Sequence, residues 1–157
     1  MSDHVIVCAH CHSINRVEQN ELINHPTCVD CAELLLSKSP IEADEALFNR
    51  FIINSTLPVI VNFWGAWSGK SLEMAEIFTS LADTFKQDAV FLRVNSQQEQ
   101  VLANSYKLID FPTFILFQSG AEYRRLQGAV SERDFHLWLE RYLRVKRKKL
   151  IPHPSSV

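Results

Sequence analysis

The segment from Pro58 to Trp64 constrains the fold more than any other part of this chain. It reads Pro-Val-Ile-Val-Asn-Phe-Trp, an apolar run broken by a single amide. β-Branched residues favour extended backbone. A strand without polar alternation is typical of the centre of a sheet that is buried on both faces. The segment therefore predicts a central strand with other elements packed above and below it.

The flanking segments alternate between helical and extended patterns. Apolar residues spaced three or four apart predict helices, and short apolar runs predict strands. Helices are predicted over 41–53, 71–86 and 98–106, and strands at 34–36, 89–94 and 111–117, with a hairpin at Gly120 leading into 122–127 and a last helix capped by Ser131. The resulting order, βαβαβαββα, is that of an α/β layer fold with a mixed sheet.

Composition points to an ordinary soluble protein. Hydrophobic residues make up 46% of the chain, and the net charge of −2 gives no overall attraction to nucleic acid or to an anionic membrane. No apolar run approaches the ~18 residues of a membrane span. The N-terminus lacks the basic start and apolar core of a signal peptide. We therefore expect no membrane association and a cytoplasmic, reducing location.

All four cysteines lie within the first 31 residues. They form two C-x-x-C pairs, Cys8 with Cys11 and Cys28 with Cys31, separated by sixteen residues. This is the spacing of a zinc ribbon, in which four thiolates complete a tetrahedral shell. A segment of ~35 residues has too little core to fold unaided. The spacing therefore predicts a structural Zn²⁺ ion.

Other interpretations of the cysteines are weaker. Disulfides are disfavoured in a reducing compartment, and simple buried thiols would not require this spacing. Cys8 to His12 also matches the C-x-x-C-H pattern of haem attachment, which leaves the second pair unexplained. His10, His12 and His25 lie near enough in sequence to replace a cysteine ligand, but four thiolates already fill a structural site.

Directly after the central strand, Trp64–Ser71 reads Trp-Gly-Ala-Trp-Ser-Gly-Lys-Ser. This resembles the active-site segment of the thioredoxin family, in which an apolar strand leads into W-C-G-P-C at a helix start. Ser68 and Ser71 stand where that family has its nucleophilic and resolving cysteines, and Lys70 stands at its proline. Disulfide exchange requires a thiolate. As written, the chain should be inactive as a dithiol reductase.

The resemblance covers nearly the whole chain. Phe111-Pro112-Thr113 matches the family's cis-proline loop, Gly120 its hairpin glycine, and Gly128-Ala129 the late glycine that lets a partner chain approach. The cysteine pairs make the zinc-binding, longer type of bacterial thioredoxin the nearest match. It implies a zinc ribbon over 1–37 and a thioredoxin-like domain over 38–145 with a mixed central sheet flanked by helices. The run of Lys and Arg predicts a basic, flexible tail over 146–157.

The departures from the family pattern extend beyond the cysteines. Asn62 stands where the family has a buried aspartate that assists proton transfer, and an amide cannot act as that general base. Arg93 matches a basic residue on the neighbouring strand and should then face an amide. Replacing only the two cysteines of a working relative would not change these positions, so Asn62 and Lys70 favour natural loss of redox activity.

Two catalytic alternatives use the same residues. Gly65 to Ser71 looks like a phosphate loop, but only three residues separate the first glycine from Gly-Lys-Ser, where the motif needs four. Ser68 and Lys70 could form a nucleophile pair, although no oxyanion site is recognisable. A hydroxyl that caps the helix at Ser68 is the simpler interpretation, and the helix start with Lys70 could still hold an anion.

The C-terminal end is strongly basic, with Arg141, Arg144, Lys146, Arg147, Lys148 and Lys149. Cations suit the C-terminal end of a helix, which favours a solvated helix end. Binding of an acidic partner or of nucleic acid is the alternative.

Three functional hypotheses result. The leading one is a redox-inactive protein-binding module that uses the thioredoxin groove. The groove residues are Trp67, Gly69, Lys70, Phe111, Pro112, Thr113, Gly128 and Ala129 around Ser68 and Ser71. The second is a protein-disulfide oxidoreductase whose two cysteines were replaced by serine. The third is a nucleic-acid-associated factor that acts through the ribbon and the basic tail.

Overall fold

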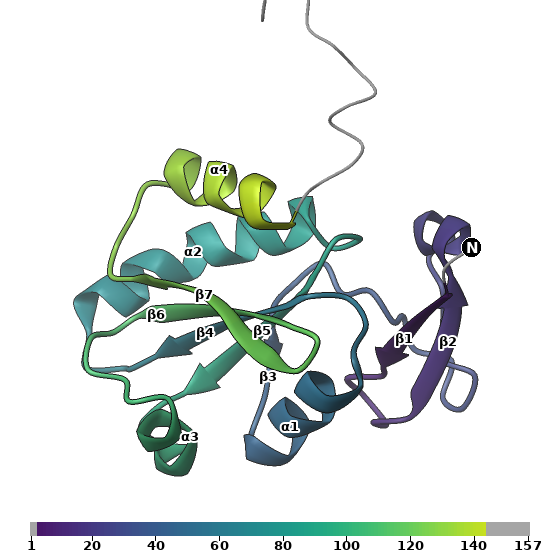
Figure 1. Cartoon of the computed structure of the whole chain (residues 1–157), viewed down its shortest axis with the longest axis horizontal. Coiled ribbons are helices and arrows are strands. Elements are labelled where there is room, and N and C mark those ends of the chain that lie inside the picture. Colours follow the sequence, from purple (N-terminus) through teal and green to yellow (C-terminus); the bar gives the residue numbers. More distant parts are fainter. Residues whose placement is uncertain (1–2, 144–157) are drawn as a thin grey trace, which may run out of the picture.

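The computed structural model describes residues 3–143. Its main part has the order βαβαβαββα, in which all the elements after the first strand follow the predicted sequence of helices and strands (Figure 1). The elements are β3 (Ile41–Glu42), α1 (Glu45–Asn54), β4 (Val59–Trp64), α2 (Gly69–Thr84), β5 (Val90–Asn95), α3 (Gln100–Ser105), β6 (Thr113–Gln118), β7 (Ala121–Gln127) and α4 (Glu132–Leu143). The predicted hairpin turn is present, since Ser119 and Gly120 both have positive φ, and Ser131 Oγ accepts the Asp134 N–H as the predicted helix cap.

The five strands form one mixed sheet in the order β3-β5-β4-β6-β7. β3 and β4 both run parallel to β5, whereas β6 is antiparallel to β4 and to β7. β4 therefore lies at the centre, as its unbroken apolar character predicted. Its first five residues are buried. This is the mixed sheet flanked by helices that the sequence predicted.

Helices cover both faces of the sheet (Figure 1). Val59, Val61 and Phe63 pack into the core formed with α1 and α3. Ile60, which points to the opposite face, packs into the core formed with α2 and α4. Because side chains alternate along a strand, Asn62 lies on the same face as Ile60, beneath α2.

Two predicted elements are wrong. Residues 34–36 form no strand, and Leu34 makes only an isolated bridge with Thr27. The first helix begins at Glu45 rather than at residue 41, because the Asp44 side chain accepts the Leu47 N–H at 2.9 Å and caps it there. Ile41 and its neighbour instead extend the sheet along the open edge of β5. A two-residue strand produces no periodic signal, so the pattern merged it with the helix.

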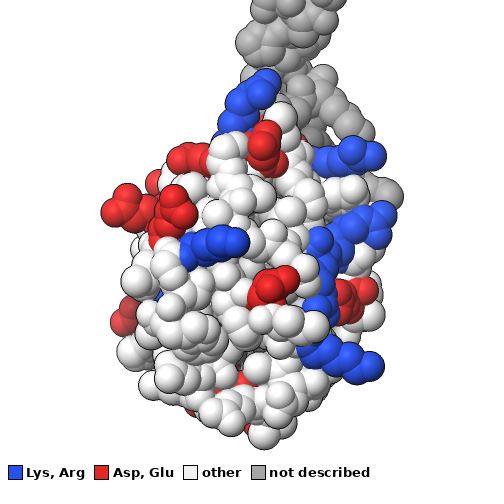
Figure 2. Space-filling model, turned by 90° about the vertical axis from the view of Figure 1, so that its left-hand side faces the viewer, with Lys and Arg blue, Asp and Glu red and all other residues white. Residues whose placement is uncertain are grey.

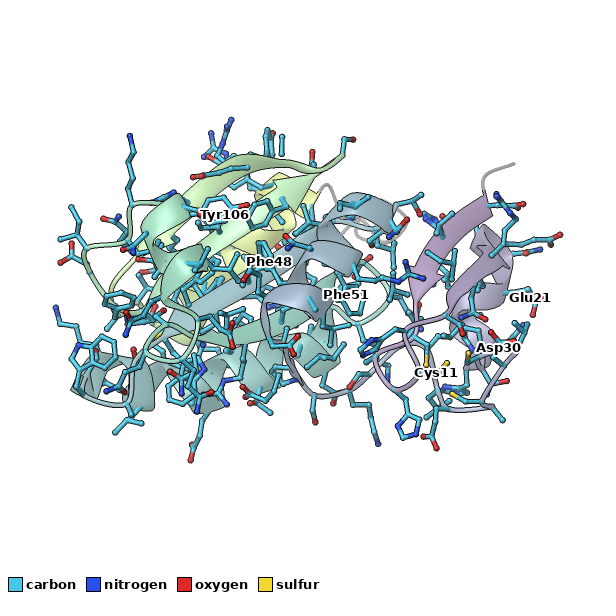
Figure 3. All side chains as sticks on the ribbon, turned by 90° about the horizontal axis from the view of Figure 1, so that it is seen from below. Cys11, Glu21, Asp30, Phe48, Phe51 and Tyr106 are labelled. Carbon is cyan, nitrogen blue, oxygen red and sulfur yellow. The ribbon has the colours of Figure 1, made fainter. Side chains whose placement is uncertain are left out.

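The N-terminal residues 3–36, here called the cysteine segment, lie beside α1 (Figures 1 and 3). They contain the antiparallel strands β1 (Asp3–Val7) and β2 (Ile14–Glu18) and the 3-10 helix η1 (Gln19–Asn24). The buried side chains of Ile6, Val7 and Leu22 belong to the same apolar core as Phe48 and Phe51 of α1. The segment is therefore packed onto the sheet domain through a shared hydrophobic core.

Polar contacts reinforce this junction. The Thr56 hydroxyl accepts the Val5 N–H at 2.9 Å, and the Thr56 N–H donates to the Val5 carbonyl at 3.2 Å. Arg50 Nε donates to the His12 carbonyl at 2.9 Å, one residue beyond Cys11. These bonds join β1 and the first cysteine loop to α1 and to the loop that follows it.

Within residues 3–143, no helix has the length and apolar character needed to cross a membrane. The predicted basic tail, residues 146–157, lies outside the described residues, as do all the cations of the C-terminal cluster except Arg141, which belongs to α4.

Candidate functional site

Ser68 sits at the start of α2 and ties that helix to the loop before β6. Its Oγ accepts the Ser71 N–H at 3.2 Å, which caps the helix as the sequence predicted. The same hydroxyl donates to the Phe111 carbonyl at 3.0 Å. Two segments more than forty residues apart are thus joined through one serine, and its proton is held by a carbonyl oxygen rather than by a base.

Ser71 lies beneath Ser68 and is only 1% exposed. Its Oγ accepts the Gly65 N–H at 3.2 Å, so it satisfies a backbone group at the end of β4. A hydroxyl does this well, but it provides no thiolate for disulfide exchange. Both serines therefore act as structural hydrogen-bonding groups.

Trp67 presents the largest exposed apolar surface of this loop, at 56% exposure. Its ring meets the Phe111 ring edge-on, with centroids 5.2 Å apart. On its other side the indole lies directly over Gly65, where an added Cβ would come within 2.4 Å of the ring. Only glycine allows the indole to rest there. The sequence identified Trp67, but nothing in it pointed to Gly65, because the contact depends on how the tryptophan side chain is folded back.

The Gly65→Ala variant should displace the Trp67 indole from its seat beside Phe111. The indole cannot yield by a few tenths of an ångström, since three of its ring atoms lie within 2.6 Å of the new Cβ. We expect more solvent-exposed Trp67 emission and only a small loss of stability, because the displaced atoms are the far end of a side chain that is already 56% exposed. Fluorescence measured with and without Trp67→Phe isolates this tryptophan. Gly69→Ala is the matched control, because a Cβ there meets nothing within 4 Å. Equal spectra for the two alanine variants would contradict the packing.

The loop before β6 and the residue after β7 complete this end of the sheet. The Phe111–Pro112 peptide bond is cis, as the resemblance implied. The Gly128 N–H donates to the Pro112 carbonyl at 2.8 Å, and Gly128 has a φ of 84°, which favours glycine. Thr113 is buried, and its hydroxyl donates to the Asp110 carbonyl at 2.6 Å.

The predicted site residues therefore meet at one end of the molecule. Direct contacts join Trp67 and Ser68 to Phe111, and Pro112 to Gly128. Of the other predicted residues, Ser71 is hydrogen-bonded to Ser68 and Thr113 to the Asp110 carbonyl. Gly69 and Lys70 open α2, and Ala129 follows Gly128. Figure 2 looks onto the left-hand end of Figure 1, where these loops lie, and uncharged surface predominates in the centre and lower part of the view. Basic side chains gather along one edge and acidic ones along the other.

Asn62, beneath this loop, is fully buried, and neither its Nδ2 nor its Oδ1 has a hydrogen-bond partner within residues 3–143. Asn62 and Arg93 are register partners on neighbouring strands. The sequence predicted that Arg93 would face the Asn62 amide. The Arg93 guanidinium instead pairs with Glu42 and lies 4.5 Å from the Trp64 ring centroid. β3 provides that carboxylate, and β3 was absent from the predicted elements.

Replacing Asn62 by leucine should stabilise the protein. A buried polar group without a partner costs about 1–3 kcal/mol, whereas an apolar group of similar shape carries no such penalty. We expect a rise in melting temperature of several degrees, at roughly 2–4 °C per kcal/mol. Calorimetry of Asn62→Leu beside Asn104→Leu, an exposed α3 position, tests this. A lower melting temperature for Asn62→Leu but not for Asn104→Leu would show that the Asn62 amide has a hydrogen-bond partner in solution.

The two cysteine pairs form nearly identical loops. In the first, the Cys8 N–H donates to the Ser13 carbonyl at 2.9 Å, and the His12 N–H donates to the Cys8 carbonyl at 2.8 Å. In the second, the corresponding bonds run from Cys28 to Glu33 and from Ala32 to Cys28, at 2.8 and 2.9 Å. His12 and Ala32 both adopt positive φ, at 68° and 67°. Two similar knuckles thus face each other.

The knuckles bring the four Sγ atoms of Cys8, Cys11, Cys28 and Cys31 within 4.8 Å of one another. Cys8 lies 3.6 Å from Cys31, and Cys11 lies 3.6 Å from Cys28, with all four as free thiols. Four sulfurs at about 2.3 Å from a tetrahedral zinc ion are about 3.8 Å apart. The thiol cluster therefore fits a metal ion of that size. No histidine or carboxylate belongs to this group among the described residues.

The pKa values of Cys28 and Cys31 shift in opposite directions. Burial raises the pKa of Cys28, but hydrogen bonds from the Asn15 side chain and from the backbone of Asp30 outweigh it and bring the pKa to about 6. Cys31 accepts a backbone hydrogen bond from Glu33 that lowers its pKa, but burial and the neighbouring cysteines raise it to about 12. A bound cation would lower the pKa of every cysteine that binds it, because it favours the thiolate form of each ligand.

Comparison with known proteins agrees with this geometry. Residues 39–141 match the family model described as Thioredoxin. Thioredoxin C-3 from Corynebacterium nephridii is 35% identical over 141 residues, which cover 88% of this chain and 95% of that protein. Thioredoxin Y1, chloroplastic, from Arabidopsis thaliana is 31% identical over 109 residues, covering 68% of this chain and 63% of that protein.

A solved structure shares the fold. A mutant thioredoxin from Halobacterium salinarum NRC-1 superposes with a TM-score of 0.62 at 20% identity, covering 73% of this chain and 96% of that one. The family model spans the sheet and nearly all of its helices, and the Corynebacterium nephridii relative aligns over almost its full length. The chain therefore belongs to the thioredoxin family.

Proposed function

We propose that this chain is a redox-inactive member of its family that binds protein partners through the groove around Trp67, Phe111 and Gly128. One observation carries the proposal. The hydroxyls of Ser68 and Ser71 occupy the two thiol positions and are both engaged in hydrogen bonds that hold the loop together. The site thus keeps a defined shape while it lacks the nucleophile that disulfide exchange requires.

The exposed surface supports a binding role. Aromatic side chains that are held in one orientation contribute much of the binding free energy at protein interfaces. Trp67 is held from two sides, by Gly65 beneath it and by the edge of Phe111. Thioredoxin-family proteins act on protein substrates, so a partner of the same class is the natural ligand for this groove.

The cysteine segment is proposed as a zinc ribbon with a structural Zn²⁺ held by Cys8, Cys11, Cys28 and Cys31. The sulfur spacing and the paired knuckles support it. The ribbon would span residues 1–37, beside a thioredoxin-like domain over 38–145, as in the longer bacterial type. A reducing, cytoplasmic location is part of the proposal, because it keeps the four thiols available to the metal.

Partner capture tests the binding proposal. The chain is immobilised with excess reductant, beside Trp67→Ala and beside Leu137→Ala, which removes an α4 side chain of comparable exposure, at 47%. We expect Trp67→Ala to lose partners that Leu137→Ala retains. If Trp67→Ala captures the same partners as the unaltered chain, the proposal is wrong.

A single Ser68→Cys variant separates this role from the alternative, an oxidoreductase whose cysteines were replaced. With Ser71 still in place, a mixed disulfide formed at position 68 has no resolving thiol and accumulates. If the groove keeps a substrate-recognition role, the variant traps proteins that carry disulfides. If binding is independent of redox chemistry, the partners captured with the unaltered chain are released by salt or competitor and are not trapped as mixed disulfides.

A further inference from the structure

Asn15 is a buried polar residue in the smallest part of the molecule. It belongs to β2, where buried and exposed residues alternate, and it is only 3% exposed. An amide that is buried in a segment of this size needs hydrogen-bond partners to offset its desolvation. Unlike Asn62, it has them, and all of them belong to the two cysteine knuckles.

Both ends of the Asn15 amide contact these knuckles. Its Oδ1 accepts the Val29 N–H at 2.9 Å, and its Nδ2 donates to Cys28 Sγ and to the Ser13 carbonyl, both at 3.4 Å. The orientation of the amide is determined by chemistry. Since the Val29 N–H is a donor, the atom facing it must be the oxygen, which leaves the NH₂ group to face the sulfur.

At the equivalent sulfur of the first knuckle, Cys8 Sγ, the described residues provide no side-chain amide. Among the described residues, Cys8 Sγ accepts backbone N–H groups from His10 and Cys11, both at 3.4 Å. Cys28 Sγ accepts a backbone N–H from Asp30 at the same distance and has the Asn15 amide in addition. The sulfurs of Cys8 and Cys28 therefore differ in one side-chain contact, which comes from one residue of β2. The later cysteines differ as well, because Cys11 Sγ donates to Ser13 Oγ at 3.2 Å.

We infer that Asn15 is a positioning residue for metal binding, which holds Cys28 Sγ in place for the ion through its N–H···S bond. The inference rests on the proposed metal site. Partners of this kind, which fix the orientation of a ligand, typically affect metal affinity by about 10- to 100-fold. Asn15 also holds the backbone next to Cys28, because its Oδ1 accepts the Val29 N–H.

Two variants separate these contributions. Asn15→Asp keeps the acceptor for the Val29 N–H and nearly the same volume, but it replaces the donor to Cys28 Sγ with an oxygen. Asn15→Leu removes all three hydrogen bonds, to Val29, Cys28 and Ser13. Asn20→Leu, at an exposed position of η1, is the control. Circular dichroism and melting curves establish that each full-length variant is folded before metal is added.

The measurement is Zn²⁺ and Co²⁺ binding to the reduced full chain, by competition with a chelator. We expect about a 10- to 100-fold weaker affinity for Asn15→Asp than for the parent chain. We also expect its thiolate-to-Co²⁺ charge-transfer bands to move to longer wavelength, because a sulfur without the N–H donor holds its electrons less tightly. A purely structural role would lower melting temperatures and leave the band position unchanged.

The outcomes are distinct. A parent chain that binds neither ion contradicts the proposed metal site, and this inference with it. A parent chain that binds both ions while Asn15→Asp matches it in affinity and band position overturns the inference alone.

Discussion

We expect removal of the proposed metal ion to lower the melting temperature of the whole protein, and not only that of the cysteine segment. Ile6, Val7 and Leu22 of that segment share one core with Phe48 and Phe51 of α1. If the knuckles open, those side chains lose their position and α1 loses the cover on its outer face. Structural zinc contributes about 10–16 kcal/mol of apparent binding free energy in small peptide sites, which is comparable to the stability of an entire domain.

We expect chelation under reducing conditions to lower the melting temperature by more than about 10 °C, at roughly 2–4 °C per kcal/mol. Scanning calorimetry of the zinc-loaded chain, with and without chelator, provides the measurement. Cys28→Ser without chelator should give the same low value, since one ligand is lost. Two separate unfolding transitions, of which the one at higher temperature does not shift with chelator, would contradict this. They would show that the shared core does not couple the cysteine segment to the sheet domain.

Restoring both thiols produces the largest change in activity. The chain as given should show no catalysed reduction of a protein disulfide, because a serine hydroxyl forms no thiolate at neutral pH. Ser68→Cys/Ser71→Cys places a thiol at the start of α2, where a helix N-terminus lowers the pKa of a cysteine. We expect this double variant to reduce disulfides slowly, and Ser68→Cys alone to show no turnover for lack of a resolving thiol.

Asn62 accounts for the slowness expected of the double variant. It lies buried on the face of β4 beneath α2, and its amide cannot take or return a proton at the resolving thiol. Adding Asn62→Asp should raise turnover by about 10²-fold, the lower end of what general acid–base catalysis contributes. Brisk turnover by the double variant without the aspartate would instead favour the hypothesis in which a working oxidoreductase lost only its cysteines.

Local patterns predicted the parts of this protein that depend on neighbouring residues. The apolar run of β4 placed that strand at the centre of the sheet, and the serine at position 68 capped α2 as expected. The spacing of the cysteine pairs anticipated a cluster, because each C-x-x-C closes its own tight loop. The edge strand β3 was missed, since two residues paired with β5 carry no period of their own.

The sequence by itself determined the alternation of helices and strands and the pairing of the cysteines, since these follow from residue type and short spacing. The fold family and the missing thiols came from its resemblance to the thioredoxin family. Only the tertiary structure decided which side chains meet across the chain: the Trp67 indole over Gly65, the guanidinium of Arg93 on Glu42, and the Asn15 amide on Cys28 Sγ. These contacts depend on rotamers and on strand register, which are set when the core packs. A sequence pattern cannot predict these contacts, because packing brings together residues that have no regular spacing in the sequence.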